Sequence, residues 1–280
     1  MHEIVLGLAN LNNKYGKLKN NLSNKEFKKI ILKKKKTLVD TAILYKNNSY
    51  ILRRNKDKIK IISKLPNLDL RKNLSHQIHK YFFNHLKKIG LKKIDTLLLH
   101  YPDQLFQKNG NQIYLILTEL KKKKFVDNIG YSLYEDKNLI SMVKNFKPDV
   151  IQFPLNILNT RFTSKKNINF LKQNNIRLQV RSIFLQGILL NLNKLNHEFS
   201  FLKKYSKKIE KFSHKNNISV MDCCINFIKN QKYIDQIIIG CNSATQYDAI
   251  IKSIKGNKTS YPKLNLLRKE LRQIDPRKWK

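Results

Sequence analysis

The sequence has only three cysteines and no long apolar run, and both shortages limit what the protein can be. Cys223, Cys224 and Cys241 are too few for a plausible disulfide framework, which indicates a reduced, intracellular protein. The first nine residues lack the basic and long apolar regions of a signal peptide and are typical of a strand. No apolar run approaches membrane-spanning length. We therefore expect a cytoplasmic protein without membrane segments.

Common nucleotide-binding and metal-binding signatures are also absent. No Gly-x-Gly-x-x-Gly follows any predicted strand, which argues against a Rossmann dinucleotide site, and there is no P-loop. His76, His79 and His85 share one predicted helix, but no carboxylate or cysteine accompanies them. We interpret these histidines as solvated helix residues and predict no metal site.

Acidic residues are the largest shortage, because 19 Asp and Glu face 57 Lys and Arg for a formal net charge of +38. Such a charge is typical of proteins that bind nucleic acid or anionic membranes. The lysine runs 33–36, 87–88 and 121–124 instead each close a helical pattern just before a strand, where cations complement the helix C-terminus. Aromatic residues are not interleaved with these runs. We therefore expect no specific nucleic-acid partner, and we expect these lysines on the face opposite the active site.

Strand and helix patterns alternate along the chain, and no linker with a composition shift divides it. Eight short apolar segments predict strands, at residues 4–9, 38–42, 58–63, 95–99, 126–131, 150–153, 177–183 and 234–239. Helical patterns cover residues 23–35, 50–54, 70–89, 112–123, 136–145, 162–174, 200–215, 219–230, 243–254 and 263–274. This alternation favours a closed (β/α)8 TIM barrel over an open doubly wound sheet. We assign residues 1–280 to a single α/β domain of that fold.

Three successive predicted strands carry ionisable residues at or just past their C-terminal ends. Asp40 and Tyr45 follow the second strand, Lys64 ends the third, and His100 follows the fourth. Ionisable groups are costly to bury without partners, which suggests that these groups are one another's partners. Barrel active sites form where the C-terminal strand ends meet. Asp, Tyr, Lys and His converging there would make a proton-transfer site.

These landmarks resemble those of the aldo-keto reductases, in the same order and over nearly the whole chain. The matching segments are Asp40-Thr41-Ala42 with Tyr45, Ser63-Lys64, Asp95-x-x-x-x-His100, Ile129-Gly130-Tyr131-Ser132, Gln152-x-x-x-Asn156, the run 181–189 and Ile239-Gly240. Each motif alone is weak, but seven in order are strong.

The resemblance implies reduction of an aldehyde or ketone to an alcohol, or the reverse, with NAD(P)H and a tetrad of Asp40, Tyr45, Lys64 and His100. A phenol is a poor acid, with a pKa near 10. Lys64 would lower the pKa of Tyr45, and Asp40 would keep the lysine charged and oriented. Tyr45 would then donate a proton to the carbonyl oxygen as hydride arrives at carbon, while His100 hydrogen-bonds the same oxygen.

The resemblance also implies NADP(H) or NAD(H), lying extended across the barrel mouth. Ser132 and Gln152 match carboxamide-binding positions, and Gly187 lies in the loop that crosses the pyrophosphate. The adenosine end would lie near a helix N-terminus suited to phosphate, beside Gly240, Asn242, Ser243 and Gln246. Arg181 stands where many members have a stacking tyrosine, and its planar cation could stack on the nicotinamide. No basic residue for a 2′-phosphate directly follows Gly240, so NADP versus NAD stays open.

Two departures keep other functions open. Leu133 replaces an asparagine that often follows the strand-five serine, and residues 46–50 depart from the usual run after the tyrosine. The chain could therefore be a cofactor-binding but non-catalytic sensing or partner subunit. A Schiff-base lyase using Lys64 is a further alternative, although Asp40 and Tyr45 fit proton donation better. Arg181, Lys46 and the overall charge favour a small anionic or sugar-like carbonyl substrate.

Overall fold

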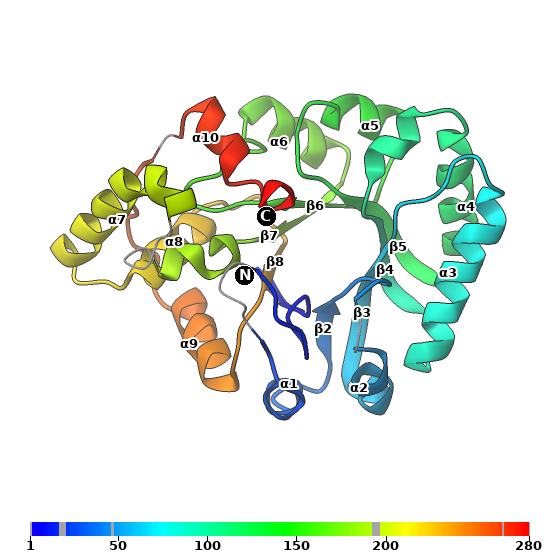
Figure 1. Cartoon of the computed structure of the whole chain (residues 1–280), viewed down its shortest axis with the longest axis horizontal. Helices are drawn as coiled ribbons and strands as arrows, with labels where there is room; N and C mark the ends of the chain where they lie inside the picture. Colours follow the sequence, from blue (N-terminus) through cyan, green and yellow to red (C-terminus); the bar gives the residue numbers. More distant parts are fainter. Residues whose placement is uncertain (1, 17–20, 46–47, 192–196, 265, 280) are drawn as a thin grey trace.

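In the computed structural model the chain forms a closed barrel of parallel strands surrounded by helices (Figure 1). The structure describes residues 2–16, 21–45, 48–191, 197–264 and 266–279. Within these ranges eight strands pair in sequence order, and β1 also pairs with β8 to close the barrel. The strands are β1 (Glu3–Gly7), β2 (Thr37–Asp40), β3 (Ile59–Leu65), β4 (Ile94–Leu99), β5 (Val126–Ser132), β6 (Val150–Pro154), β7 (Arg177–Arg181) and β8 (Gln236–Ile239). The predicted single-domain (β/α)8 fold is confirmed.

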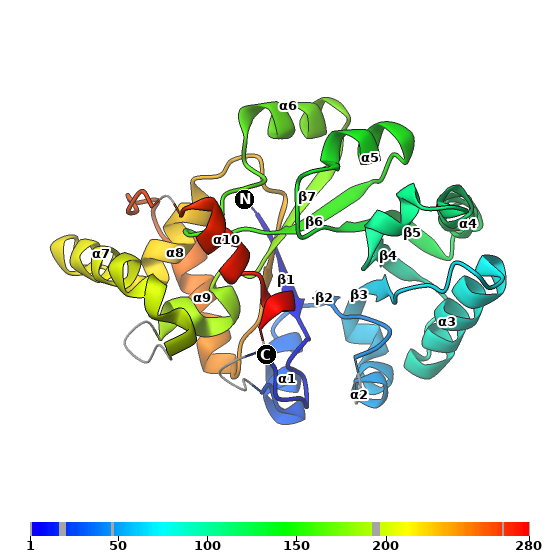
Figure 2. The same cartoon turned by 45° about the horizontal axis from the view of Figure 1, so that its top comes forward.

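Helices fill the connections between the strands and cover the outside of the barrel (Figure 2). They are α1 (Asn24–Ile31), α2 (Ser49–Arg54), α3 (Leu74–Ile89), α4 (Gly110–Lys122), α5 (Leu139–Asn145), α6 (Lys165–Gln173), α7 (Lys203–Lys215), α8 (Val220–Lys229), α9 (Ala244–Lys255) and α10 (Arg268–Gln273). Short 3₁₀ turns add η1 (Lys56–Lys58), η2 (Pro102–Phe106), η3 (Leu185–Leu190), η5 (His197–Leu202) and η6 (Pro276–Lys278). The C-terminal segment with α10 and η6 lies over the barrel in Figure 2.

Several helices begin later than the apolar pattern predicts, because a polar side chain caps them. Asn73 accepts the amide of His76 and so begins α3 at Leu74, and Ser164 caps α6 in the same way. The largest difference lies near the C-terminus, where the predicted helix 263–274 begins only at Arg268. There the Glu270 carboxylate accepts the amide of Leu267 and fixes the start of α10.

The barrel has an apolar core between strands and helices and a mixed interior. Apolar side chains fill part of the interior, namely Val5, Leu38, Ile62, Leu98, Val150 and Ile238. A row of buried amides fills another part. Gln152 donates to Gln179 at 3.2 Å, Gln179 to Gln236 at 2.6 Å, and Gln236 to Glu3 at 2.6 Å. Because a buried amide is costly without a partner, this row satisfies polar groups that the sequence places inside the barrel.

The lysine runs lie where the sequence predicts them. Lys33 to Lys36 lie between α1 and β2, while Lys87 and Lys88 form the last turn of α3 and Lys121 and Lys122 that of α4. They therefore stand beside the N-terminal ends of strands, on the face opposite the strand C-termini. None of the helices in the described ranges is long and apolar enough to cross a membrane.

His85 differs from the expectation that the helix histidines are solvated. It faces the barrel from α3, is 5% exposed, and its Nε2 lies 3.1 Å from the hydroxyl of Ser63. Burial, helped by the nearby Lys88 charge, lowers the pKa of His85 to about 4. His76 on the same helix is exposed. Among the described residues, no three or more His, Cys, Asp or Glu form a group that could hold a metal ion.

The buried His85 should make the fold less stable as the pH falls. The unfolded chain binds a proton near pH 6.5, whereas the folded pKa is about 4. The contribution of His85 to the free energy of unfolding is therefore fully present above about pH 6.5, and it decreases as the pH is lowered toward 4. Urea unfolding should show a loss of about 1–2 kcal/mol between pH 7 and pH 5 from this group. His85→Gln should remove that part of the slope, and the matched change His76→Gln should keep it; an equal slope in both variants would contradict this assignment.

Candidate active site

A cavity of about 410 Å³ opens at the C-terminal ends of the strands. All of the predicted site residues line it except Ser243, namely Asp40, Tyr45, Lys64, His100, Ser132, Gln152, Arg181, Gly187, Gly240, Asn242 and Gln246. Parallel strands bring their C-terminal ends to one face, so residues far apart in sequence meet there. The lining of the cavity runs from the ionisable cluster on β2, β3 and β4, at one end, to the β8–α9 junction at the other.

Asp40 and Lys64 form a buried ion pair at the base of the cavity. Lys64 Nζ donates to Asp40 Oδ1 at 2.5 Å and to the carbonyl of Thr41 at 3.1 Å. The side chain of Lys64 is 3% exposed, and that of Asp40 is 9% exposed. Burial lowers the pKa of Lys64, and the Asp40 carboxylate opposes that shift. The predicted contact between these two residues is therefore present.

Gln152 binds the other oxygen of Asp40. Its Nε2 donates to Asp40 Oδ2 at 2.8 Å, while its own Oε1 accepts a long hydrogen bond of 3.4 Å from Ser132. Each oxygen of Asp40 thus has one donor, from Lys64 and from Gln152. The amide row through the barrel begins at Gln152. Its far end at Glu3 is therefore linked to Asp40 through Gln152, Gln179 and Gln236. A carboxylate bonded through both oxygens has little freedom to rotate.

Tyr45 lies in the cavity, but its electrostatics differ from the sequence-based expectation. Burial raises the pKa of Tyr45 above its ordinary value, and Tyr15, Asp40 and Tyr134 raise it further. The Arg181 guanidinium opposes this rise. The predicted lowering of the Tyr45 pKa is therefore wrong for this structure, because burial outweighs the opposing charge of Arg181. Tyr45 is a neutral phenol that carries its proton at neutral pH.

His100 faces the cavity from the end of β4 and is a neutral imidazole. Burial, followed by the charges of Lys64 and Arg181, lowers the pKa of His100 to about 3. A neutral imidazole donates one hydrogen bond and accepts another. His100 is therefore a hydrogen-bonding group in this cavity rather than an acid.

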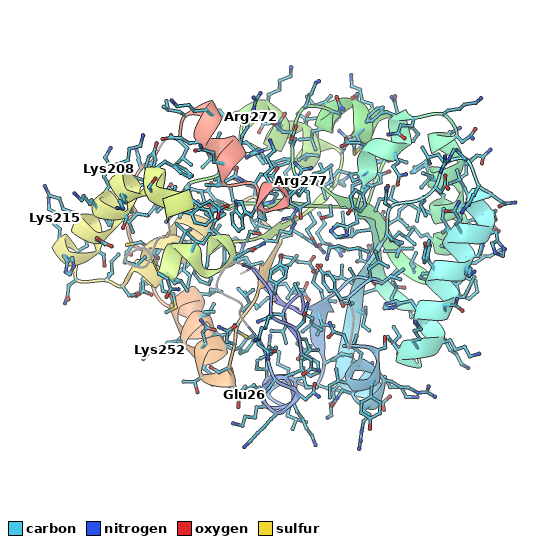
Figure 3. The ribbon with its side chains drawn as sticks, in the orientation of Figure 1. Glu26, Lys208, Lys215, Lys252, Arg272 and Arg277 are labelled. Carbon is cyan, nitrogen blue, oxygen red and sulfur yellow. The ribbon has the colours of Figure 1, made fainter. Side chains whose placement is uncertain are left out.

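Arg181 stacks on a protein side chain. Its guanidinium lies 4.1 Å from the ring centre of Tyr134, and Nη2 donates to the carbonyl of Leu133 at 3.1 Å. Arg277 of the C-terminal η6 lies 4.3 Å from the same ring, and Figure 3 shows it above the barrel. Two cations therefore hold one aromatic ring.

A second cavity, of about 540 Å³, shares His100, Ser132 and Tyr134 with the first.

The loop after β7 lines the cavity in a strained conformation. Ser182, Leu185 and Gln186 all have φ between 49° and 58°, a left-handed region that non-glycine residues rarely adopt, and Gly187 follows at 90°. Such strain is kept where surrounding contacts determine it, and often at functional sites. Here Gln186 donates to the hydroxyl of Tyr15, which joins the β7 loop to the β1 loop across the cavity.

At its other end the cavity meets the first turn of α9. Ser243 does not line the cavity but caps the helix, since its hydroxyl accepts the amide of Gln246 at 3.1 Å. The Gln246 side chain in turn accepts the amide of Asn242 at 2.7 Å. The buried Asn10 donates to the carbonyl of Cys241 at 2.9 Å. Neutral amides therefore line this end.

A sequence model of the aldo/keto reductase family matches residues 3–264 of the chain. The chain belongs to the aldo/keto reductase family. It is thus an NAD(P)-dependent aldo-keto oxidoreductase acting on small-molecule carbonyl compounds. No curated protein sequence matches the chain.

Solved structures of other aldo-keto reductases share its fold. One from Bacillus halodurans in the holo form has a TM-score of 0.71 at 17% identity, over 97% of this chain and 90% of that one. A glycerol dehydrogenase from Gluconobacter oxydans has a TM-score of 0.68 at 18% identity, with the same coverage. One from a Medee basin deep-sea metagenome library has a TM-score of 0.63 at 18% identity, over 98% and 89% of the two chains. At these identities the likeness is one of fold.

The cavity has the volume and the polar lining of a small-molecule site. Its volume lies in the range of small-molecule sites. Polar groups for orientation lie at both ends, Ser132 and Gln152 at one and Asn10 and Gln246 at the other. A Cβ added to Gly240 would meet no atom within 4 Å, so the main chain is open to the cavity there.

Tyr15, Tyr134, Gln186, Asn10 and Arg277 line the two cavities but were not among the predicted site residues. Tyr134 and Asn10 lie two or three residues past a strand end, so a wider window after each strand would have found them. Arg277 comes from the C-terminal segment, and only the fold brings it to the mouth. Lys46 and Asn47, in the departing run after Tyr45, lie outside the described residues.

Proposed function

We propose that the chain reduces an aldehyde or ketone to an alcohol, or catalyses the reverse, with Tyr45 as the proton donor. The nicotinamide cofactor supplies the hydride when bound. The observation that best supports this proposal is the meeting of Tyr45, His100 and the Asp40–Lys64 pair in one cavity at the strand C-termini. Removal of either partner of that pair would change the field around the phenol.

In the proposed reaction Tyr45 gives its hydroxyl proton to the carbonyl oxygen, which becomes the alcohol oxygen. Its raised pKa keeps that proton in place until the oxygen gains negative charge. Arg181, which lowers the pKa of Tyr45, would stabilise the phenolate that remains. His100, with a pKa near 3, would donate a hydrogen bond to the same oxygen without competing as an acid.

The remaining predicted residues would hold the cofactor, NADP(H) or NAD(H). Ser132 and Gln152 would contact the carboxamide, the Gly187 loop the pyrophosphate, and Gly240, Asn242 and Gln246 the adenosine end. Ser243 would act indirectly by capping α9. Arg181 stacks on Tyr134, so we assign its ring contact to that tyrosine and not to the nicotinamide.

The second cavity supports a neutral, hydroxylated substrate over an anionic one. Among the described residues that line it, two are acidic, Asp103 and Glu135, and two are basic, Lys137 and Arg277. Arg277 is also paired with Asp275 at 2.6 Å and with Glu135 at 3.2 Å. The other lining groups include the amides of Asn67, Gln107 and Asn138, which suit hydroxyl groups. We therefore propose a sugar-like or polyol-derived carbonyl compound; one structural relative is a glycerol dehydrogenase.

Lys64 gives little support to a Schiff-base lyase. Its amine is buried and its protons are directed at Asp40 and Thr41, so it would have to lose the ion pair before attacking a carbonyl.

The prediction of a cytoplasmic protein rests on the few cysteines in the sequence, and it stays a prediction.

Nucleotide binding followed by a carbonyl panel tests the proposed function. Titration with NADH and NADPH should show saturable binding, and a neutral hydroxyaldehyde should be reduced faster than its carboxylate-bearing analogue. Borohydride should trap no substrate adduct on Lys64. Binding without turnover of any carbonyl would favour the sensing or partner subunit. A trapped adduct on Lys64 would favour the lyase.

A further inference from the structure

An acidic residue, Glu26, stands beside the β8–α9 end of the cavity, outside the residues that line it. Glu26, from the first turn of α1, accepts the backbone amide of Ala244 at the start of α9 with its Oε2 at 2.7 Å. Figure 3 shows Glu26 between these two helices. Its side chain is 21% exposed. A carboxylate of this chain therefore already occupies the positive end of the α9 dipole.

Two further amides at this helix start are also bonded to the protein's own side chains. Ser243 accepts the amide of Gln246, and Gln246 accepts that of Asn242. A helix N-terminus binds a phosphate through free amides and its dipole. Here three of the amides are bonded internally, and an anion has been placed among them.

Two of the described cations near this end are already paired. Lys29 pairs with Glu26 at 2.7 Å, and Lys33 pairs with Asp248. Lys252 lies on the outward side of α9, away from Glu26 (Figure 3). Among the described residues that line the cavity, the two cations are Lys64 and Arg181, both at the opposite end. The described residues that line the β8–α9 end are neutral and include Asn10, Cys241 and Gln246.

We propose that this site selects NAD(H) over NADP(H), and that Glu26 is the residue that disfavours the 2′-phosphate. The inference rests on the proposed function, which places the adenosine end of the cofactor beside α9. A 2′-phosphate would bring two negative charges toward the Glu26 carboxylate, whose Oε1 pairs with Lys29 and whose Oε2 accepts the Ala244 amide. Like charges brought together weaken binding. A ribose with a free 2′-hydroxyl avoids this repulsion, and in Rossmann-type sites an acidic residue hydrogen-bonds that hydroxyl of NAD.

Binding measurements by calorimetry test the proposal independently of turnover. ADP-ribose and 2′-phospho-ADP-ribose are the sharpest probes, because they differ only in the phosphate and lack the nicotinamide. Wild-type protein should bind ADP-ribose and NADH about tenfold or more tightly than their 2′-phosphorylated counterparts. Glu26→Gln keeps an amide oxygen to accept the Ala244 amide but removes the charge, so it should narrow this ratio severalfold by strengthening binding of the phosphorylated ligands.

The matched control is Glu119→Gln, which makes the same change in net charge on α4, where Glu119 pairs with Lys123. This variant should keep the wild-type ratio. Tighter binding of NADPH than NADH by the wild-type protein would overturn the inference and leave the proposed function standing. An equal narrowing of the ratio by Glu119→Gln would overturn the role of Glu26. Failure to bind any of the four ligands would overturn the proposed function and this inference together.

Discussion

Replacing Tyr45 by phenylalanine should lower turnover by about 10²–10⁴-fold, the usual contribution of a positioned proton donor. The ring remains, so packing in the cavity should change little. The hydroxyl is a neutral phenol because burial raises the pKa of Tyr45. Its loss should therefore leave nucleotide affinity nearly unchanged and reduce the rate of the chemical step. Single-turnover oxidation of bound NADH by an aldehyde, together with nucleotide titration, measures both quantities.

Tyr50→Phe is the matched control for this experiment. Tyr50 is 66% exposed on α2, where its hydroxyl accepts a hydrogen bond from Arg54. The variant removes the same atom from the same residue type outside the lining of the cavity and should keep wild-type turnover. If Tyr45→Phe also kept full turnover, Tyr45 would not be the acid, and the proton would have to come from another group.

The order of elements could be predicted from the sequence because each buried parallel strand is a short apolar run with a polar residue after it. Asp40, Lys64 and His100 follow this rule, and the fold brings all three to one cavity. Helix starts were less predictable, since they depend on capping contacts such as that of Asn73 with His76. The start of α10 depends on Glu270 in the same way.

The environment of the site was harder to predict than its residues. The pKa of Tyr45 depends on burial and on Tyr15 and Tyr134, which come from loops far apart in the sequence. His85 looked like a helix-surface residue, because one histidine in an apolar stripe does not reveal its partner Ser63 on β3. Glu26 and Ala244 are likewise joined only when α1 packs against α9. Sequence patterns identify faces and strand ends, whereas such pairings follow from tertiary packing.

Replacing Lys64 by methionine should destabilise the fold by about 3–5 kcal/mol, because it leaves the charge of a buried partner uncompensated. Asp40 would keep its bond from Gln152 but lose its counter-charge. The unopposed carboxylate would also raise the pKa of Tyr45 further, since Asp40 already acts in that direction. Turnover should therefore fall as well. Lys93→Met is the matched control, because Lys93 and Asp127 form an exposed pair at 3.0 Å that should contribute less than about 1 kcal/mol.

Asp40→Asn removes the other charge of the same pair and should lower the free energy of unfolding by less than Lys64→Met does. Lys64 can become neutral in that variant, because burial already lowers the pKa of Lys64 and only Asp40 opposes the shift. An asparagine oxygen can still accept from Lys64 or from Gln152, so we expect a loss of about 1–3 kcal/mol. Urea unfolding at neutral pH measures each variant, and the rate of NADH oxidation is recorded on the folded fraction. If Lys64→Met proved as stable as Lys93→Met, the buried pair would not hold Asp40 in place. Loss of turnover in Asp40→Asn with full stability would instead assign the pair to catalysis alone.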